Sequence, residues 1–592
     1  MDHSSRLFLG VESSILGQKW EERLTPVERE YADSIADNLD IKELVARVLV
    51  GRGITMEQSE SFLHPTLRDE MPDPSNLTDM DRATDRLVSA IINQQRVVIF
   101  GDYDVDGATS AALMSRYFTY FDLPHEIYIP DRIFEGYGPN KTAIEEMVES
   151  GIQLIITVDC GSVSVEILES AIGSGVDVVV IDHHQVGDVL PEVCAVVNPN
   201  RNDDLSGQGH LSAVGIVFLV LVSLNRVFRK KGNTIPDLRN WLDIVALGTV
   251  CDLVPLKGLN RPYVLRGLDV IRRQRSVGLT TLSRVSHQDG PAMPSHLAFL
   301  LGPRINAGGR IGNASLGARL LTTQDWTEAE EIAVQLDQLN TERQAIESVM
   351  LEEAINQAES QIGLDSGRSV LVTESDHWHA GVVGLIASRL KDRYRRPVFA
   401  IAFDDTERGQ GSARSVVGID IGHLVRMAVE ERILEKGGGH AMAAGISIKK
   451  DRMSHFRSFM EEALSRSRKM IINTLKIDSL LTARSATKDL FDDLQKAGPY
   501  GSGHSQPIFV FPRHIIRHVS SVGKNHNHIR FRIESADGAT LDGIGFGITD
   551  SPLGQALLEG RNPNMHLAGT LEYSFYHGRH QMKMRLIDAA IS

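Results

Sequence analysis

Three short aliphatic runs, each followed at once by acidic residues, constrain the fold of this chain more than any other feature. They are VVIF at 97–100, LIITV at 154–158 and VVVI at 178–181. Helical patterns separate the runs. Continuous apolar strands that alternate with helices are typical of a parallel sheet that is buried on both faces. The sequence therefore predicts an α/β domain built on a parallel sheet.

The residues that follow these strands are carboxylates and imidazoles. They are GDYDVDG at 101–107, then Asp159, then Asp182, His183 and His184. The carboxyl ends of parallel strands face one crevice, so we expect these clusters to meet there. Asp252, at the end of another apolar run, is a fourth candidate. Crowded carboxylates repel one another unless cations neutralise them, and oxygen with imidazole ligands suits Mn²⁺ or Mg²⁺. The pattern predicts a two-metal site for hydrolysis at phosphorus.

A calcium loop is the alternative interpretation of the first cluster. Asp102, Asp104 and Asp106, followed by Gly107, match the beginning of an EF-hand loop. The twelfth position of such a loop should supply a bidentate glutamate, but it is Leu113 in this chain. The preceding segment is also predicted as a strand rather than a helix. The sequence therefore favours the catalytic metal site.

Composition and pattern divide the chain into five segments. Residues 326–361 contain no Gly or Pro and carry nine acids against one base, which indicates one long acidic helix. The predicted segments are a helical lead-in at 1–75, the parallel-sheet domain at 76–290, a basic segment with the connecting helix at 291–362, a second α/β domain at 363–468 and a small β-barrel at 469–592.

Charge and composition exclude several classes of protein. A net charge of −15 argues against coating nucleic acid by bulk electrostatics, although residues 261–310 carry eight arginines against two acids. Three cysteines exclude a disulfide scaffold and fit a reducing cytoplasm. The longest uncharged apolar stretch, 211–224, is shorter than the roughly 20 residues that cross a bilayer. We expect a cytoplasmic protein with no signal peptide and no membrane contact.

The tandem Asp-His-His at 182–184 is the signature of the DHH phosphoesterases, which this chain resembles. Within that family the resemblance narrows to the RecJ exonucleases, and it extends from about residue 45 to the end. The other matching stretches are GDYDVDGATS (101–110), RIFEGYGPN (132–140), ITVDCGSVS (156–164), ALGTVCDLVP (246–255), GPRINAGGR (302–310), HWHAGVVGLIASRL (377–390), GSARS (411–415), GGGHAMAAG (437–445) and PYGSGHSQPIF (499–509).

The resemblance implies which residues form the site. The implied ligands of two Mn²⁺ or Mg²⁺ ions are Asp102, Asp104, Asp106, Asp159, His183 and Asp252. Asp159 is the expected bridging carboxylate. Asp102 either binds a metal ion itself or contacts the residues that bind it. The implied catalytic residues are Asp104, Asp106, Asp159, His183 and His184, with His184 facing the scissile phosphate or orienting a ligand.

The resemblance also implies roles for the remaining segments of the chain. The second α/β unit resembles the DHH-associated domain, and the final β-rich segment corresponds to an OB-fold that grips single strands. The implied substrate-binding residues are Arg304, Arg310, His379, Arg414, Gly438, Gly439 and His440. In two places the sequence departs from the family pattern. Cys251 replaces a small residue, and His504-Ser505 replaces Asn-Pro. Cys160 and Cys251 are predicted to pack in the interior rather than to act as redox switches.

The resemblance implies an exonuclease that hydrolyses single-stranded DNA from the 5′ end to 5′-mononucleotides in DNA recombination and repair. Its implied partners are single-stranded DNA, a DNA helicase and a single-strand-binding protein, and it is expected to be a monomer. One alternative is a phosphodiesterase for cyclic dinucleotides or very short RNA, which the length and the C-terminal β domain disfavour. The other is a scaffold without activity, which the complete set of acids and histidines disfavours.

Overall fold

A five-stranded parallel sheet forms the first large domain of the computed structural model, which describes residues 6–132, 134–365, 367–465, 473–523, 526–559, 565–576 and 579–591. In sheet order its strands are β3 (His125–Tyr128), β2 (Val97–Gly101), β4 (Leu154–Val158), β5 (Asp177–Ile181) and β6 (Ala195–Val197). The pairings are all parallel, and both faces of the central strands are buried. The parallel-sheet domain predicted from the aliphatic runs is confirmed.

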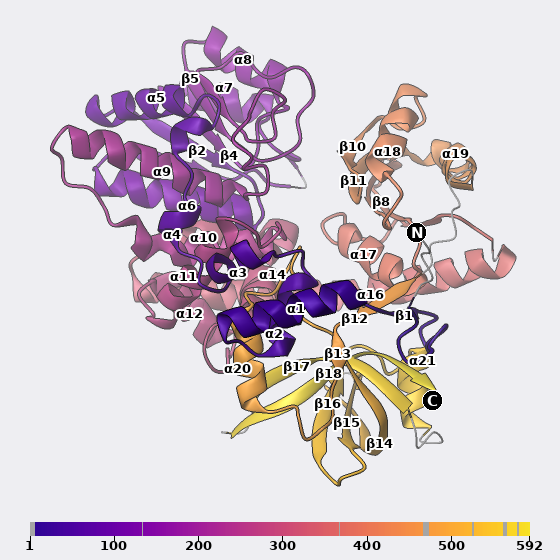
Figure 1. The fold of residues 1–592 in the computed structure, drawn as a ribbon. Coiled ribbons are helices and arrows are strands. Elements are labelled where there is room, and N and C mark those ends of the chain that lie inside the picture. The colour runs from indigo at the N-terminus through magenta and orange to yellow at the C-terminus, as the bar shows by residue number, and fades with distance from the viewer. Residues whose placement is uncertain are drawn as a thin grey trace.

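Helices cover both faces of this sheet (Figure 1). One face packs against α5 (Met80–Ile92), α6 (Val105–Tyr120) and α9 (Ala213–Lys230), and the other against α7 (Lys141–Glu149) and α8 (Val165–Gly173). The first core continues into a group of helices: η2 (Leu238–Trp241), α10 (Leu242–Cys251), α11 (Asn260–Arg272), α12 (Val277–Val285), α13 (Pro294–His296), η3 (Leu297–Leu301), α14 (Gly302–Ile311) and α15 (Ser315–Thr322).

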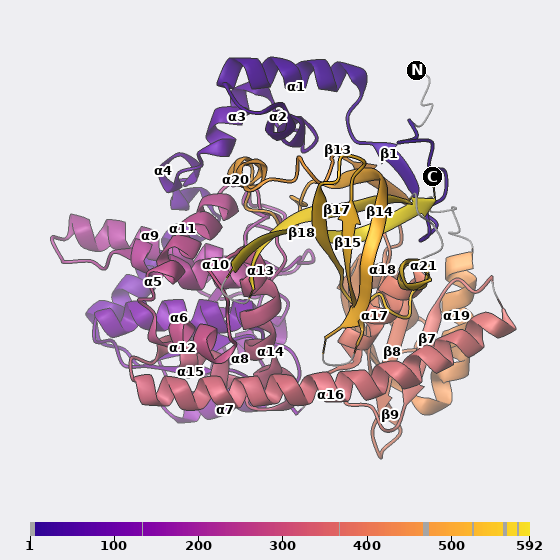
Figure 2. The ribbon, with the colours of Figure 1, turned by 90° about the horizontal axis from the view of Figure 1, so that it is seen from below.

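One long helix, α16 (Trp326–Leu364), connects this domain to the next (Figure 2). Its first half buries Ile332 and Leu336 in the core of the first domain. Its second half buries Met350 and Ala354 in a core shared with the second domain. The predicted connecting helix is therefore confirmed, and it is anchored at both ends by apolar packing.

The second domain holds a mixed sheet in the order β10-β11-β9-β8-β7. Only β7 and β8 are parallel, and the other neighbours are antiparallel. The strands are β7 (Leu371–Ser375), β8 (Val398–Phe403), β9 (Arg408–Arg414), β10 (Lys436–His440) and β11 (Ala443–Lys449). Helix α17 (Val383–Tyr394) packs toward α16. Helices α18 (Ile421–Glu430) and α19 (Met453–Ser465) cover the opposite face of the sheet. The short helix η4 (Lys450–Arg452) precedes α19.

The C-terminal strands close into a barrel, as predicted. The sheet order is β13-β14-β15-β16-β18-β17, and a further pairing of β14 with β17 closes it. The elements are β12 (Thr474–Ile477), β13 (Ser479–Leu480), α20 (Lys488–Lys496), β14 (Phe509–Val522), β15 (His528–Glu534), β16 (Thr540–Gly545), α21 (Pro552–Leu558), β17 (Met565–Tyr576) and β18 (Arg579–Ile591).

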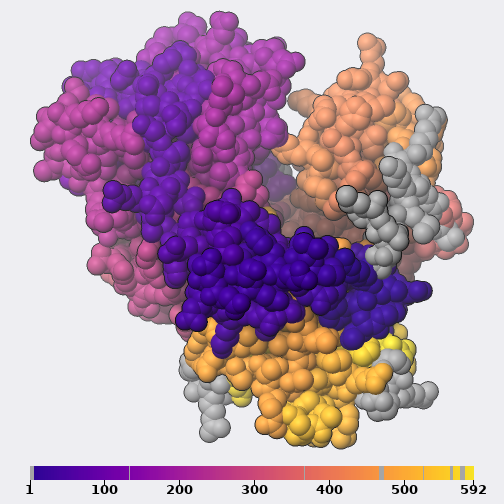
Figure 3. Space-filling model, viewed as in Figure 1, coloured from indigo at the N-terminus to yellow at the C-terminus, as the bar shows by residue number. Residues whose placement is uncertain are grey.

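The N-terminal segment packs against this barrel (Figures 1 and 3). It comprises β1 (Lys19–Glu22), α1 (Pro26–Leu39), α2 (Glu43–Val50), α3 (Met56–Leu63), α4 (Leu67–Glu70) and η1 (Pro74–Asn76). Strand β1 pairs in parallel with β12, and Leu49 shares a core with Phe531 of β15. The sequence predicted helices here, but it predicted neither β1 nor the contact with the barrel. None of the helices in the described part of the chain has the length and apolar character that a bilayer crossing requires.

Candidate active site

The acidic loop after β2 is shaped by a helix cap. Asp104 is the N-cap of α6, and its Oδ1 accepts hydrogen bonds from the backbone N–H groups of Asp106 (2.8 Å) and Gly107 (3.1 Å). A Cβ atom at Gly107 would lie 2.3 Å from the carbonyl oxygen of Asp102, so only glycine fits there. The loop therefore returns tightly on itself and brings its three carboxylates together.

Asp106 is held by a second helix. Its carboxylate accepts hydrogen bonds from the N–H groups of Ala213 (2.6 Å) and Val214 (3.1 Å), at the beginning of α9. Such unpaired N–H groups at a helix N-terminus stabilise an anion. Burial, followed by the charge of Asp104, nevertheless raises the pKa of Asp106 to about 7. The site therefore concentrates more negative charge than the protein alone neutralises.

Asp159, directly after β4, has a strained backbone. Its φ is 62°, in the left-handed region that costs a non-glycine residue about 1–2 kcal/mol. The phenol of Tyr137 donates a hydrogen bond of 3.3 Å to its carbonyl oxygen. Strain that the surrounding structure maintains is typical of functional sites.

Asp182 orients the two histidines that follow it. Its Oδ1 accepts from the backbone N–H groups of His183 (2.8 Å) and His184 (3.2 Å) and lies 2.8 Å from Nδ1 of His184. Burial would raise the pKa of Asp182, but its hydrogen bond to His184 and the charges of both histidines together outweigh burial and hold that pKa well below its usual range. Burial would lower the pKa of His184, but the bond to Asp182 and the charges of Asp182, Asp102 and Asp104 together raise it to about 9. These carboxylates therefore favour the protonated form of His184.

His183 lies among three carboxylates from three other segments. Its Nε2 is 3.2 Å from Oδ1 of Asp159, 3.6 Å from Oδ2 of Asp252 and 3.9 Å from Oδ2 of Asp106. Asp252 is the C-cap residue of α10. Burial, followed by the charge of His184, lowers the pKa of His183 to about 4, so its ring is neutral and able to bind a cation.

The converging atoms lack hydrogen-bond partners, which is the arrangement expected of metal ligands. The buried atoms without a partner include Oδ1 of Asp102, Oδ1 of Asp159, Nε2 of His183 and Oδ2 of Asp252. Burial, followed by the charge of a neighbouring aspartate, raises the pKa of these three aspartates well above the usual range. Three overlapping groups have ligand atoms within 4.8 Å of one another: Asp159, His183 and His184; Asp106, His183 and Asp252; and Asp102, Asp104 and Asp159. Their oxygen and imidazole atoms fit Mn²⁺ or Mg²⁺.

The second domain brings its own residues to this cluster. The ring of His440, at the end of β10, stacks on His184 with 6.3 Å between ring centroids. Gly439 has a φ of 150°, and a Cβ atom there would lie 2.3 Å from the carbonyl oxygen of Ala443. A Cβ atom at Gly438 would meet open space. The glycine-rich strand β10 therefore places an uncovered backbone beside the histidines.

Three arginines gather beside the acids, although the sequence identified only two of them. Burial, followed by the charge of Arg132, lowers the pKa of Arg310 to about 10, and the same two causes lower the pKa of Arg414 and of His379. The guanidinium of Arg132 lies 4.9 Å from the ring centre of Tyr103. Guanidinium groups that repel one another in this way offer donors suited to an anion. Arg132 was missed, although it opens the matching stretch at 132–140.

Arg304 is placed differently from the other predicted substrate residues. Its Nε donates to Asp337 of α16 (2.8 Å), and one of its terminal nitrogens donates to the carbonyl oxygen of Leu300 (2.7 Å). Arg310, near the C-terminal end of α14, instead donates to the carbonyl oxygen of Gly381 in the second domain (3.1 Å). Contact of Arg304 with a phosphate would require it to leave Asp337.

The two cysteines beside the candidate ligands are held in packed surroundings. Cys160 is buried, and burial raises the pKa of its thiol well above the usual range. Cys251 is only partly buried and ends α10. Its thiol contacts the carbonyl oxygen of Leu297 at 3.4 Å. Burial also raises the pKa of this thiol, which makes it a poor nucleophile.

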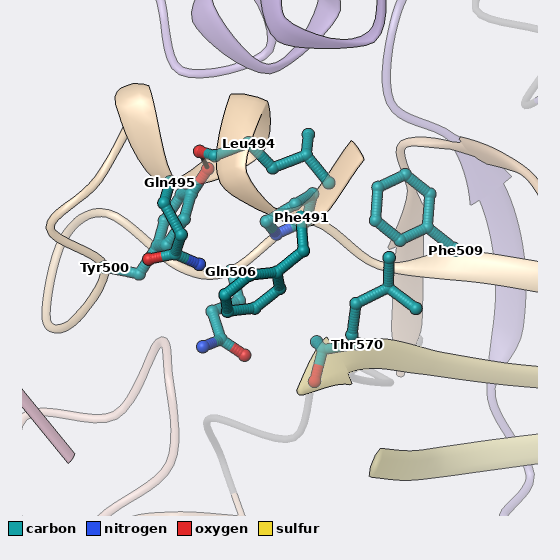
Figure 4. Close-up of a pocket in the computed structure, with 9 residues that line it drawn as sticks. Phe491, Leu494, Gln495, Tyr500, Gln506, Phe509 and Thr570 are labelled. Carbon is teal, nitrogen blue, oxygen red and sulfur yellow. Dashed lines mark hydrogen bonds between the residues drawn. The ribbon is translucent and has the colours of Figure 1, made fainter. Parts of the chain in front are cut away.

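A small hollow on the barrel lies apart from the cluster (Figure 4). It is bounded by Phe491 and Leu494 of α20, Tyr500, and Thr570 of β17. Among the described residues that line it there is no aspartate or histidine, so they offer no groups for hydrolysis. The candidate ligands lie instead in the first domain, with His440 of the second domain beside His184, and the space-filling view is hollowed between these two domains (Figure 3).

Comparison with known families divides the chain into three matched regions. Residues 96–249 match the DHH family, N-terminal domain; residues 367–466 match the DHHA1 domain; and residues 477–588 match the RecJ OB domain.

Curated relatives match nearly the whole chain. The single-stranded-DNA-specific exonuclease RecJ of Bacillus subtilis is 34% identical over 580 residues, which cover 97% of this chain and 71% of that protein. The protein of the same name from Escherichia coli is 32% identical over 538 residues, which cover 88% and 92%. Among solved structures, RecJ from Thermus thermophilus in complex with Mn²⁺ is 27% identical with a TM-score of 0.78, covering 96% of this chain and 78% of that one.

Proposed function

The chain belongs to the RecJ family of single-stranded-DNA-specific exonucleases, and from this premise we propose that it digests the strand from its 5′ end to 5′-mononucleotides. The observation that carries the proposal is the convergence of unpartnered ligand atoms from Asp102, Asp159, His183 and Asp252 in one place. A scaffold without activity would have no reason to keep these atoms buried and unpaired.

We propose that this cluster holds two Mn²⁺ or Mg²⁺ ions. Asp159 belongs to two of the three ligand groups, which supports it as the bridging carboxylate, and His183 belongs to two as well. When bound, such ions lower the pKa of an attacking water and offset the charge on a phosphate. The proposed ligands are Asp102, Asp104, Asp106, Asp159, His183 and Asp252.

The residues around the cluster would bind and orient the phosphate. Arg132, Arg310 and Arg414 offer planar donors that can fork onto phosphate oxygens. His184, protonated and held by Asp182, would donate a hydrogen bond to the scissile phosphate, with His440 on the other side. The backbone of Gly438 and Gly439 allows a phosphate to approach closely.

Further parts of the proposal rest on the family alone. We infer a role in DNA recombination and repair in the cytoplasm, action as a monomer, and cooperation with a helicase and a single-strand-binding protein. The direction of digestion is inferred in the same way.

Digestion of a 3′-labelled oligonucleotide tests the activity. The single strand, its duplex and a cyclic dinucleotide are each incubated with Mn²⁺, Mg²⁺ or EDTA. We expect a metal-dependent ladder that shortens from the 5′ end of the single strand only. Cleavage of the dinucleotide alone would contradict the exonuclease proposal, and binding without cleavage in every metal would favour a scaffold.

Asp104→Asn and Asp106→Asn test the site. Asparagine caps helices as well as aspartate does, so Asp104→Asn should leave α6 intact. We expect each variant to lose hydrolysis by at least about 100-fold. The unfolding temperature should stay near that of the parent for Asp104→Asn. It should fall for Asp106→Asn, because both oxygens of Asp106 accept from backbone N–H groups and an amide offers only one acceptor. Parental rates with Mn²⁺ in a folded variant would show that the ligand assignment is wrong.

A further inference from the structure

The residues directly after β6 connect the loops that carry the candidate ligands. β6 contributes no ligand itself, but Asn198 follows it with a side chain that is 0% exposed. The Nδ2 group of Asn198 donates to Oγ of Ser162 (2.9 Å) and to the carbonyl oxygen of His184 (2.9 Å). Its Oδ1 accepts from the backbone N–H of Asn200 (2.9 Å). One buried amide therefore joins the loop after β4 to the loop after β5.

Asn200 extends this connection to a third segment. Its Nδ2 donates to the carbonyl oxygens of His183 (2.5 Å) and Gly209 (3.3 Å). Gly209 precedes α9, whose first N–H groups hold Asp106. The two asparagines thus tie together two loops that carry candidate ligands and the segment before α9, the helix whose N–H groups hold Asp106.

The chemistry of a buried amide explains why this connection constrains the loops. A buried amide is costly unless its hydrogen bonds are made, and both N–H donors of Asn198 are used. Ser162 lies three residues after Asp159, and its N–H also donates to Asp182 (3.2 Å). Movement of either loop away from the other would leave a buried donor unpaired.

We propose that Asn198 is a positioning residue, which fixes the distance between Asp159 and His183 and thereby the affinity of the site for its cations. It touches neither of these side chains and acts through Ser162 and the backbone of His184. Residues behind metal ligands commonly change metal affinity or activity by roughly 10- to 100-fold when they are replaced. The proposal rests on the ligand assignment made above.

The variant Asn198→Asp tests this role with little change of volume. It replaces the two N–H donors by an oxygen that cannot donate to the carbonyl of His184. The matched control is Asn225→Asp on α9. Asn225 is also buried, donates to the carbonyl oxygen of Pro236 (3.1 Å) and accepts from the hydroxyl of Tyr117 (3.1 Å). Asn225→Asp is the same chemical change as Asn198→Asp and lies in the same domain, but away from the loops that carry the candidate ligands.

A third variant, Ser162→Ala, removes only the link to the loop after β4. The unfolding temperature of each variant is measured first, and assays are performed where all are folded. Binding of Mn²⁺ without DNA is then followed by the EPR signal of the free ion. The Mn²⁺ concentration for half-maximal digestion of single-stranded DNA is measured in parallel.

We expect Asn198→Asp to bind Mn²⁺ about 10- to 100-fold more weakly, with a matching shift in the Mn²⁺ requirement for digestion. Ser162→Ala should move in the same direction by less, and Asn225→Asp should stay within about twofold of the parent. Parental Mn²⁺ affinity in a folded Asn198→Asp variant, or an equal loss in Asn225→Asp, would overturn the proposal.

Two further results keep the test decisive. If Asn198→Asp does not fold, the test rests on Ser162→Ala. Parental Mn²⁺ affinity in Ser162→Ala would then be enough to overturn the proposal. Asp159→Asn separates this inference from the one on which it rests. Parental Mn²⁺ affinity in Asp159→Asn would contradict the ligand assignment. If Asp159→Asn loses Mn²⁺ affinity while Asn198→Asp keeps it, only the role of Asn198 is contradicted.

Discussion

At the scale of single residues, Arg132 makes the clearest prediction, because its charge adds to burial in lowering the pKa of Arg310, Arg414 and His379 together. Replacing it by Ala should weaken phosphate binding and reduce kcat/KM on single-stranded DNA by about 10- to 100-fold, the effect of losing a charged hydrogen bond worth roughly 1.5–3 kcal/mol. Arg132→Lys should recover part of this loss, because lysine keeps the charge but not the fork. Steady-state digestion measures both, with Arg226→Ala, which loses an exposed pair with Asp73, as the control. Equal rates for Arg132→Ala and the control would refute the assignment.

His504 predicts a pH-dependent stability at the same scale. It is 4% exposed, shares a hydrogen bond of 2.8 Å with the carbonyl oxygen of Ala497, and stacks on Tyr500. Burial lowers its pKa to about 4. Below about pH 6.5 the unfolded chain takes up a proton that the folded chain does not, so the stability contributed by His504 is complete above that pH and is lost as pH falls toward 4.

The expected slope is about 1.4 kcal/mol for each pH unit in that window. Urea unfolding at about pH 7.5, 6.0 and 5.0 measures it. His504→Asn, which restores the residue of the family pattern, should show a shallower loss on acidification whatever its stability at neutral pH. The same slope in variant and parent would exclude His504 as its source.

At the scale of elements, α16 is the connection whose stiffness matters most. Between its two apolar anchors lies a buried polar stretch in which Glu347 pairs with both Arg343 and Arg389. Ala345 is exposed within this stretch. Proline there should cost about 3 kcal/mol and kink the helix, and glycine about 1 kcal/mol.

We expect Ala345→Pro to reduce digestion of single-stranded DNA much more than Ala345→Gly does. Binding of Mn²⁺ should be unchanged in both variants, because all proposed ligands precede α16. Small-angle scattering would report the altered arrangement of the two domains. Parental digestion by the proline variant would show that the connection need not be straight.

At the scale of the whole molecule, the first and last segments of the chain form one unit. Leu49 is 0% exposed in a core shared with the barrel, and Nε1 of Trp20 donates to Asp588 near the C-terminal end of the chain (2.9 Å). Leu49→Ala should therefore cost about 2–5 kcal/mol and destabilise the barrel, although the mutation lies far from it in sequence.

Limited proteolysis would show this effect as earlier cleavage within residues 473–591 than in the parent. Binding of Mn²⁺ by the first domain should be retained. Val27→Ala, at a side chain that is 74% exposed, is the control and should change neither property. Cleavage confined to the N-terminal segment in Leu49→Ala would contradict the shared core.

The sequence by itself determined the parallel sheet, the long helix, the barrel and the meeting of the acidic loops. Each of these follows from short-range pattern: aliphatic runs form buried strands, a segment without Gly or Pro continues as a helix, and parallel strands present their carboxyl ends on one side. Asp104 and His183 could be placed in one site because a topological rule connects them, without knowledge of any distance.

Only the tertiary structure decided which side chains complete the site and which are occupied elsewhere. Arg132 joins the arginine cluster from a loop, Arg304 pairs with Asp337, and Asn198 reaches two loops at once. The packing of Leu49 against the barrel was likewise decided only by the tertiary structure. The physical reason is that each of these contacts joins residues that are distant in sequence. No local periodicity of polar or apolar residues predicts which partner such a side chain meets, because the hydrogen bond or packing contact exists only in the folded chain.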